Sequence, residues 1–219
     1  MAVRGDSELS HTMRVAMVKN QIEKRGIKDP RLLSAMRKIP RHLFIPEHQR
    51  DRAYDDCPLP IGENQTISQP YIVALMTAHL ELTGSEKVLE LGTGSGYQAA
   101  ILCELAETVI TIERIGKLAR RAEKILTHIG YTNFQVIVGD GTEGFPPEAP
   151  YDRVMITAAT PDIPNPVVAQ IHEGGIIVAP VGMQFEQDLL KGVKKGGALK
   201  KKYLGGCRFV KLVGKYGFK

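Results

Sequence analysis

Apolar runs alternate with segments of helical periodicity along most of this chain. The runs lie at residues 87–91, 108–113, 134–138, 153–157 and 175–180. Each is short and nearly free of polar positions, which is typical of a strand buried on both faces. The intervening segments predict helices near 96–106, 115–129 and 164–172. Strands that alternate with helices form right-handed crossovers, so the pattern predicts a parallel sheet and the α/β fold class.

Two helices are predicted before these strands. The apolar residues on one face of the first are Val15, Val18 and Ile22. Gly26 should end this helix. The second has Asp29 as its cap and Pro30 at its first helical position, and it should end at Pro40.

The stretch from Pro40 to Gln69 shows no regular pattern. Irregular segments of this length inside a compact domain are usually functional. At its end Ser68 is placed to cap a further helix, because apolar residues follow it at helical spacing.

Beyond residue 182 the pattern changes to that of antiparallel strands. We expect a hairpin that turns at Gly196–Gly197, followed by one last strand with no helix between them. The sheet should therefore end antiparallel.

The composition fits one domain with a substantial core. The chain has 219 residues, of which 43% are hydrophobic and 24% charged. We expect a single domain over 1–219. It comprises a helical and loop extension (1–67), an α/β core (68–182) and C-terminal strands (183–219).

Nothing in the sequence predicts a membrane or secreted location. No run approaches the roughly 20 apolar residues that a spanning helix needs, and the N-terminal residues lack the apolar core of a signal peptide. We therefore expect a cytoplasmic protein. Cys57, Cys103 and Cys207 form no CxxC pair, so we expect reduced thiols, with neither a disulfide framework nor a metal site.

The positive charge of the chain is concentrated near its C-terminus. The net charge is +5, yet residues 191–219 carry nine lysines, Arg208 and no acid, a local charge of +10. Such a patch could attract nucleic acid or another anion. The alternative, which we favour, is an exposed edge strand protected by lysines.

A glycine-rich turn follows the first strand of the core, in "VLELGTGSGYQAA". A turn of this kind brings backbone close to a ligand at the carboxyl end of a parallel sheet. Gly92, Gly94 and Gly96 are spaced one residue too closely for the dinucleotide motif G-x-G-x-x-G. The turn resembles instead the first motif of class I methyltransferases, which bind S-adenosylmethionine. Alone, it could also serve only to pack a helix on a strand.

Two acids at the next strand ends strengthen the case for an adenosine pocket. Glu113 ends the second strand, where a carboxylate can accept hydrogen bonds from both ribose hydroxyls. Asp140 ends the third strand and is placed to accept from the adenine amino group.

Motifs along nearly the whole chain resemble the protein-L-isoaspartate O-methyltransferase family. They include "IPRHLFIP", "QTISQPYIVA", "VGDGTEGFPPEAPYDRVMITAA" and "RFVKLVGKYG". The resemblance implies a Rossmann-like class I methyltransferase fold, with a mostly parallel seven-stranded sheet, helices on both faces, antiparallel C-terminal strands and an N-terminal helical extension. Glu63–Asn64 and Lys211 depart from the usual family pattern, which leaves peptide preference open.

The resemblance also implies the reaction and its residues. A methyl group would pass from S-adenosyl-L-methionine to the free α-carboxylate of an L-isoaspartyl residue, leaving S-adenosyl-L-homocysteine. The ester would then close to a succinimide and hydrolyse partly to aspartate, which repairs the protein. Expected cofactor-binding residues are Thr66, Ile67, Glu90, Gly92, Thr93, Gly94, Gly96, Glu113, Asp140 and Gly141. Expected substrate-binding residues are Thr66, Ser68, Val210 and Leu212.

The expected chemistry needs no general base, because a carboxyl group with a pKa of about 3.5 is already ionised near neutral pH. Ser68 is the expected catalytic residue and would position the carboxylate. Backbone amides of the helix that follows it would favour the anion. The backbone of Val210 and Leu212 would pair with the substrate as an added strand.

Two other functions remain open at this point. The charged tail and the cofactor pocket would also suit an RNA or DNA methyltransferase, although no D-P-P-Y or N-P-P-Y motif occurs. A protein that binds S-adenosylmethionine without turnover is the second. We expect isoaspartyl proteins and peptides as partners, no specific nucleic acid, no membrane and a monomer.

Overall fold

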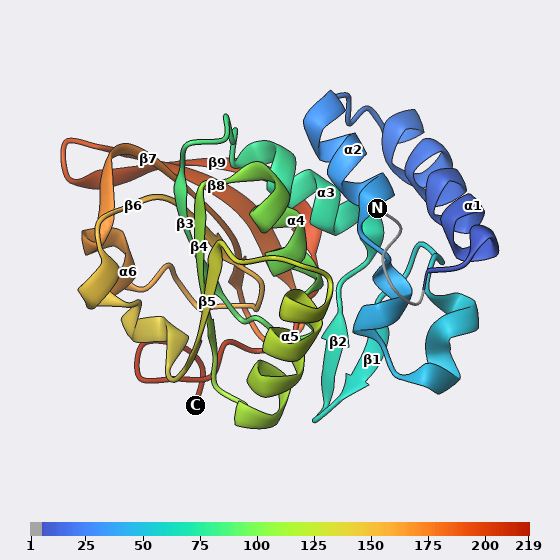
Figure 1. Ribbon diagram of the computed structural model, residues 1–219. Helices are drawn as coiled ribbons and strands as arrows, with labels where there is room; N and C mark the ends of the chain where they lie inside the picture. The colour runs from blue at the N-terminus through green and yellow to red at the C-terminus, as the bar shows by residue number, and fades with distance from the viewer. Residues whose placement is uncertain (1–5) are drawn as a thin grey trace.

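A seven-stranded sheet forms the centre of the computed structural model, which describes residues 6–219 (Figure 1). In chain order its strands are β3 (Lys87–Leu91), β4 (Thr108–Glu113), β5 (Phe134–Val138), β6 (Tyr151–Ile156), β7 (Ile171–Gly182), β8 (Gln187–Lys195) and β9 (Ala198–Cys207). Their spatial order is β5-β4-β3-β6-β7-β8-β9, with β3 to β7 parallel and β8 and β9 antiparallel. This confirms the expected fold class. Residues 1–5, the start of the expected extension 1–67, lie outside the described residues.

Successive side chains of the central strands enter two different cores. Val88 packs toward α3 and α4, whereas Leu89 packs toward α6 on the opposite face. Both side chains are fully buried. The prediction of burial on both faces is wrong for 134–138, because β5 is an edge strand whose residues are half-buried or exposed. Val138, for example, is 57% exposed.

The N-terminal helices follow their sequence signals closely. Helix α1 (Glu8–Met17) continues through a π-helical turn (Val18–Ile22) and a 3-10 turn (Glu23–Arg25). It ends at Gly26, whose φ of +94° is a left-handed conformation that suits glycine. Helix α2 (Pro30–Lys38) begins as predicted, since the Asp29 carboxylate accepts hydrogen bonds from the amides of Arg31 and Leu32 at 2.9 and 3.4 Å.

The stretch from Pro40 to Gln69 is more regular than its sequence suggests. It contains two 3-10 helices (Arg41–Phe44 and Glu47–Arg52) and a hairpin of β1 (Leu59–Gly62) and β2 (Gln65–Ile67). Glu63 and Asn64 form the hairpin turn with φ of +52° and +55°. Lys117 pairs with the Glu63 carboxylate at 2.7 Å, which places the turn beside α5, as Figure 1 shows.

Three helices of the core begin near their predicted positions, with one correction at Ser68. Helix α3 (Pro70–His79) has Gln69 at its N-cap without a side-chain bond, so the prediction that Ser68 caps it is wrong. Pro70 supplies the rigid first position instead. Helices α4 (Tyr97–Leu105) and α5 (Gly116–His128) match the prediction.

Helix α6 (Asn165–Ala169) is shorter than predicted, because the chain already enters β7 at Ile171. All helices within residues 6–219 are too short or too polar to span a bilayer.

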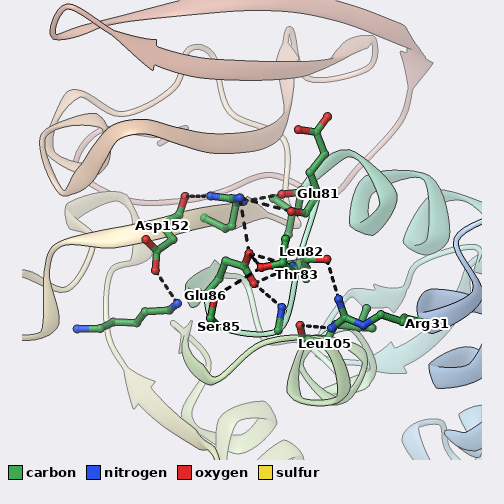
Figure 2. A network of polar contacts seen from close by, with 12 residues as sticks. Arg31, Glu81, Leu82, Thr83, Ser85, Glu86, Leu105 and Asp152 are labelled. Carbon is green, nitrogen blue, oxygen red and sulfur yellow. Dashed lines mark hydrogen bonds and ion pairs between the residues drawn. The ribbon is translucent and has the colours of Figure 1, made fainter.

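A polar network lies at the end of the sheet where strand β3 begins (Figure 2). The buried Glu86 carboxylate accepts hydrogen bonds from the amides of Thr83 and Gly84 at 2.9 Å each. Arg153 lies 3.7 Å from it and donates to the Leu80 carbonyl at 2.6 Å. Arg31 of α2 donates to the Leu82 and Leu105 carbonyls, at 3.1 Å each. The network thus ties the loop before β3 to β6 and to the helical layer.

The C-terminal hairpin turns at Gly196–Gly197, as predicted. Both glycine amides donate to the Glu173 carboxylate at 2.8 Å. Strand β9 forms the sheet edge and exposes Lys200, Lys201 and Lys202, which confirms that lysines lie along an edge strand.

The last strand predicted after this hairpin is not formed in the described residues. The chain beyond Cys207 makes only isolated bridges, from Lys211 to Ala159 and from Val213 to Phe218. It therefore runs across the carboxyl ends of the strands instead of extending the sheet.

Candidate active site

A cavity lies at the carboxyl ends of the parallel strands, where three distant segments meet. The segments are 65–68, the glycine turn at 92–95 and the C-terminal stretch 209–213. The lining also includes Val73, Met76, Tyr97, Gln98, 112–115, Gly141 and Thr157–Ala158. A crevice outside the carboxyl ends of parallel strands is where open α/β folds bind ligands.

Tight packing explains two of the three glycines in the turn. A Cβ atom at Gly92 would lie 2.6 Å from the Thr157 hydroxyl oxygen, and one at Gly96 would lie 2.9 Å from the Ala122 Cβ atom. Both residues have positive φ, at +97° and +88°. Gly94 also has positive φ, at +52°, and lines the cavity. The turn therefore packs α4 against α5 and also presents bare backbone to a ligand.

Glu113 is a nearly buried carboxylate held in place by backbone amides. One oxygen accepts from Gly94 at 2.9 Å and the other from Ile115 at 2.8 Å. Its exposed fraction is 7%, and it lines the cavity. An ionised carboxylate has about four acceptor positions. Capacity for two further donors remains, as a ribose diol would require.

Asp140 connects the chain just beyond the C-terminal stretch to the loop after β5. Its Oδ1 accepts from the amide and hydroxyl of Thr142 at 2.9 and 2.7 Å, and its Oδ2 accepts from the Lys215 amide at 2.7 Å. Burial by itself raises the pKa of this carboxyl, but these hydrogen bonds hold the pKa below its ordinary value. Gly141, its neighbour, reaches the cavity lining, whereas Asp140 does not. A contact of Asp140 with adenine stays a prediction.

Glu90 lies under the glycine turn and outside the cavity lining. Its side chain is fully buried, and Oε2 accepts from the Thr111 hydroxyl at 2.5 Å. The hydroxyls of Thr111 and Thr93 are 2.6 Å apart, so the contact continues into the turn. Burial raises the pKa of Glu90 to about 8, despite the bond from Thr111, and Glu113 adds repulsion. Burial therefore favours the protonated form of Glu90 near neutral pH, and a contact of Glu90 with the cofactor stays a prediction.

Ser68 lines the cavity together with the glycine turn and the C-terminal stretch. It is half-buried, next to buried Ile67 and exposed Thr66. The guanidinium of Arg41, itself fully buried, donates to the Ser68 carbonyl at 2.9 Å and also to the Ala53 carbonyl. This fixes the backbone at Ser68. Among the described residues the Ser68 hydroxyl has no hydrogen-bond partner.

The C-terminal stretch forms one wall of the cavity. The Val210 carbonyl accepts from the Ala159 amide, and the Leu212 amide donates to the Ala159 carbonyl, both at 2.7 Å. The Leu212 carbonyl accepts from Phe218 at 2.8 Å. In a strand, neighbouring residues point their peptide groups to opposite sides. The amide and carbonyl of Lys211 therefore face away from Ala159.

Several residues of this site could not be predicted from the sequence. Gln65, Tyr97 and Phe209 line the cavity, and Arg41 orients Ser68. Arg41 lies within the quoted motif "IPRHLFIP", but nothing in its spacing indicates a contact 27 residues away in the chain. Among the described residues, no cluster of histidine, cysteine or acidic side chains could hold a metal ion.

Residues 12–217 match the family model for protein-L-isoaspartate(D-aspartate) O-methyltransferase. The protein-L-isoaspartate O-methyltransferase of Methanoculleus marisnigri is 56% identical, over 94% of this chain and 93% of its own. The enzyme of the same name in Dictyoglomus turgidum is 53% identical, over 94% of this chain and 91% of its own.

Solved structures agree with these relatives. A protein-L-isoaspartate O-methyltransferase that is 27% identical superposes with a TM-score of 0.85, over 94% of this chain and 67% of its own. A Plasmodium falciparum protein assigned the same activity, solved with S-adenosyl-L-homocysteine, is 22% identical with a TM-score of 0.78, over 90% of this chain and 96% of its own. The second likeness bears on the fold alone. The first and the 56% identity over nearly the full length show that this chain belongs to the protein-L-isoaspartate(D-aspartate) O-methyltransferase family, whose members are methyltransferases of protein repair.

Proposed function

We propose that the cavity binds S-adenosyl-L-methionine and the α-carboxylate of an L-isoaspartyl residue side by side, for methyl transfer and repair of damaged proteins. The observation that carries this proposal is the meeting of 65–68, the glycine turn and 209–213 around one cavity. A ligand that touches the turn lies beside Ser68, and a peptide along 209–213 reaches the same point. A nucleic-acid substrate is not favoured by the family relationship.

The residues present suit the cofactor. Glu113 is oriented toward the cavity by two amides and retains free acceptor positions for ribose hydroxyls. Thr93 and Gly94 offer backbone, Ile112 and Ile115 offer apolar surface for a base, and all four line the cavity. When bound, S-adenosyl-L-methionine supplies an electrophilic methyl group, and S-adenosyl-L-homocysteine is the product.

Positioning by Ser68 is the proposed source of catalysis. The substrate carboxylate is ionised without a base, so the protein has to align it and exclude water. Correct alignment of two reactants can supply roughly 7 to 11 kcal/mol of the barrier. Arg41 fixes the Ser68 backbone, which leaves the hydroxyl of Ser68 available to donate to the carboxylate.

The substrate backbone pairs with Lys211 in this proposal. The prediction from the sequence is pairing through the backbone of Val210 and Leu212. However, the Val210 carbonyl and the Leu212 amide already bond to Ala159, and the Leu212 carbonyl bonds to Phe218. A shift of one residue places the amide and carbonyl of Lys211 at the free edge, with Val210 and Leu212 still lining the cavity. Backbone pairing gives affinity with little sequence preference, as a repair enzyme requires. Isoaspartyl proteins and peptides are the proposed partners, with a monomer in the cytoplasm as the proposed form.

The first test compares two peptides that differ only in L-isoaspartate or L-aspartate at one position. We expect base-labile methyl ester from labelled S-adenosyl-L-methionine on the isoaspartyl peptide alone. Ester on neither peptide, with the cofactor bound, would contradict the proposed substrate.

The second test is Ser68→Ala. Because Ser68 is assigned to the substrate carboxylate, we expect kcat to fall by about 10²-fold, in line with the loss of one well-placed donor. The dissociation constant of S-adenosyl-L-homocysteine should change by less than about threefold, because only the positioning of substrate is lost. Full activity in this variant would remove Ser68 from the catalytic role.

A further inference from the structure

A groove adjoins the cavity along the C-terminal stretch and carries positive charge. Thr66, Phe209, Val210 and Lys211 line both the cavity and this groove, so the two are continuous. Pro58, Gln184, Phe185 and Arg208 complete the groove. We call it the rim groove. Arg208 and Lys211 are its charged residues, and no acid lines it.

The two cations of the rim groove lack acidic partners. Among residues 6–219, neither Arg208 nor Lys211 makes an ion pair. Arg208 lies over the Phe185 ring at 5.9 Å, and Lys211 lies over the Phe218 ring at 5.6 Å. The nearest acids along the chain, Glu186 and Asp188, are exposed and do not line the groove. The groove therefore has two positive charges available to a ligand.

The groove also exposes apolar surface that has no cover in the described chain. Phe185 is 69% exposed, and Met183 in the same loop is 77% exposed. Large exposed apolar side chains beside a binding site commonly contact a ligand. Aromatic and guanidinium groups together suit a peptide with both aliphatic and carboxylate parts.

The direction of the strands separates these cations from the other basic residues of the tail. Strand β8 runs away from the cavity edge of the sheet and β9 returns to it. Lys195 and Lys200 consequently lie near the far end of the hairpin, whereas Arg208 and Lys211 lie at the cavity. The positive charges at the far end of the hairpin are thus remote from the reaction, whereas Arg208 and Lys211 line the groove beside it.

We propose that the rim groove holds the substrate chain beside the isoaspartyl residue and selects substrates that carry an acidic side chain there. This rests on the proposed function, because it requires the isoaspartyl carboxylate at Ser68. Arg208 would form a forked contact with the neighbouring carboxylate, held in place by Phe185. Lys211 would contribute through its charge while its backbone pairs with the peptide.

The test uses isoaspartyl peptides in matched pairs, with glutamate or glutamine two residues before or two residues after the isoaspartyl residue. The measurement is made at about 0.15 M salt, where long-range attraction is screened. At one of the two positions, we expect kcat/KM of the glutamate peptide to exceed that of its glutamine partner about threefold to tenfold, mainly through a lower KM. In Arg208→Gln this ratio should fall to near one. The ratio removes any loss that both peptides share.

The matched control is Lys195→Gln with Lys200→Gln, which removes two charges from the far end of the same hairpin and should leave the ratio unchanged. Equal kcat/KM for both peptides in the unmodified enzyme, or an unchanged ratio in Arg208→Gln, would overturn the selection for acidic neighbours. Absence of ester on every isoaspartyl peptide would instead overturn the proposed function, and this inference with it.

Discussion

Glu90 shows at the scale of one residue how burial changes the charge of a side chain. Its carboxyl is fully buried, and burial raises its pKa to about 8 from 4.5. Between these values the folded protein keeps the proton, whereas the unfolded chain releases it. Raising the pH therefore favours unfolding over this window, until the folded protein also ionises.

The variant Glu90→Gln should remove this dependence. A single group of this kind lowers the free energy of unfolding by on the order of 1 kcal/mol for each pH unit within its window. Urea unfolding at a series of pH values from about 4.5 to 8 should show a shallower decline in the variant than in the unmodified protein. Parallel curves for the two proteins would mean that Glu90 is ionised in the folded state.

Residue types indicated part of the site before its geometry was known. Gly92, Gly94 and Glu113 were found because a glycine turn and a strand-end acid have chemistry that their spacing reveals. Lys211 was noted only as a departure from the family pattern, because which backbone amide and carbonyl are free depends on hydrogen bonds to Ala159, far away in the chain. Ser68 was predicted to cap helix α3, but the N-cap of this helix is Gln69, because Pro70 fixes the first helical position.

At the scale of elements, the C-terminal stretch is held against the cavity by very close contacts. Asp140 accepts from the Lys215 amide, and Thr142 accepts from the Tyr216 amide at 3.1 Å. Gly214 directly precedes Lys215 in the chain, and a Cβ atom there would overlap the Asp140 carboxylate. The position of the wall that carries Val210 to Leu212 therefore depends on a glycine at 214.

The variant Gly214→Ala should displace this wall while the sheet stays intact. We expect the free energy of unfolding to fall by about 1 to 3 kcal/mol, the usual cost of overpacking, and the rate of methylation to fall by more than about tenfold. Gly206→Ala is the control, because a Cβ atom there has no neighbour within 4 Å. Isoaspartyl methylation and thermal unfolding measure both effects. Equal activity in the two variants would show that the wall tolerates the change.

The elements that the sequence revealed are those with long, one-sided or continuous apolar patterns. The parallel strands were located because side chains are buried on both faces, as at Val88 and Leu89. The β1–β2 hairpin was missed, since its turn is Glu63–Asn64 instead of the usual Asn-Gly. Prolines at 58 and 60 also argued against strands there.

On the scale of the whole molecule, charge is distributed very unevenly. The net charge of the chain is +5, whereas residues 191–219 alone carry +10. Residues 1–190 are therefore negative overall. Lys200, Lys201 and Lys202 lie together on the edge strand β9, where Lys201 pairs with Asp162 at 2.8 Å. Such a field acts on the approach of a charged substrate more than on its bound state.

Charge reversal at Lys200, Lys201 and Lys202 should weaken methylation of acidic peptides more than that of neutral ones at low salt. The difference should appear in kcat/KM at about 10 mM salt and disappear near 0.15 M, because the screening length falls from roughly 30 to 8 Å. Initial rates at both salt concentrations provide the measurement. Equal effects on the two kinds of peptide would exclude attraction by this strand.

The path of the chain after β9 has a consequence for synthesis. The sheet is complete at Cys207, yet the wall formed by 209–213 follows it in chain order. During translation the core strands are therefore available for folding before the cavity has the wall formed by 209–213. We expect a chain that stops just after β9 to retain every strand of the sheet but to lack one wall of the cavity, and therefore to lack activity.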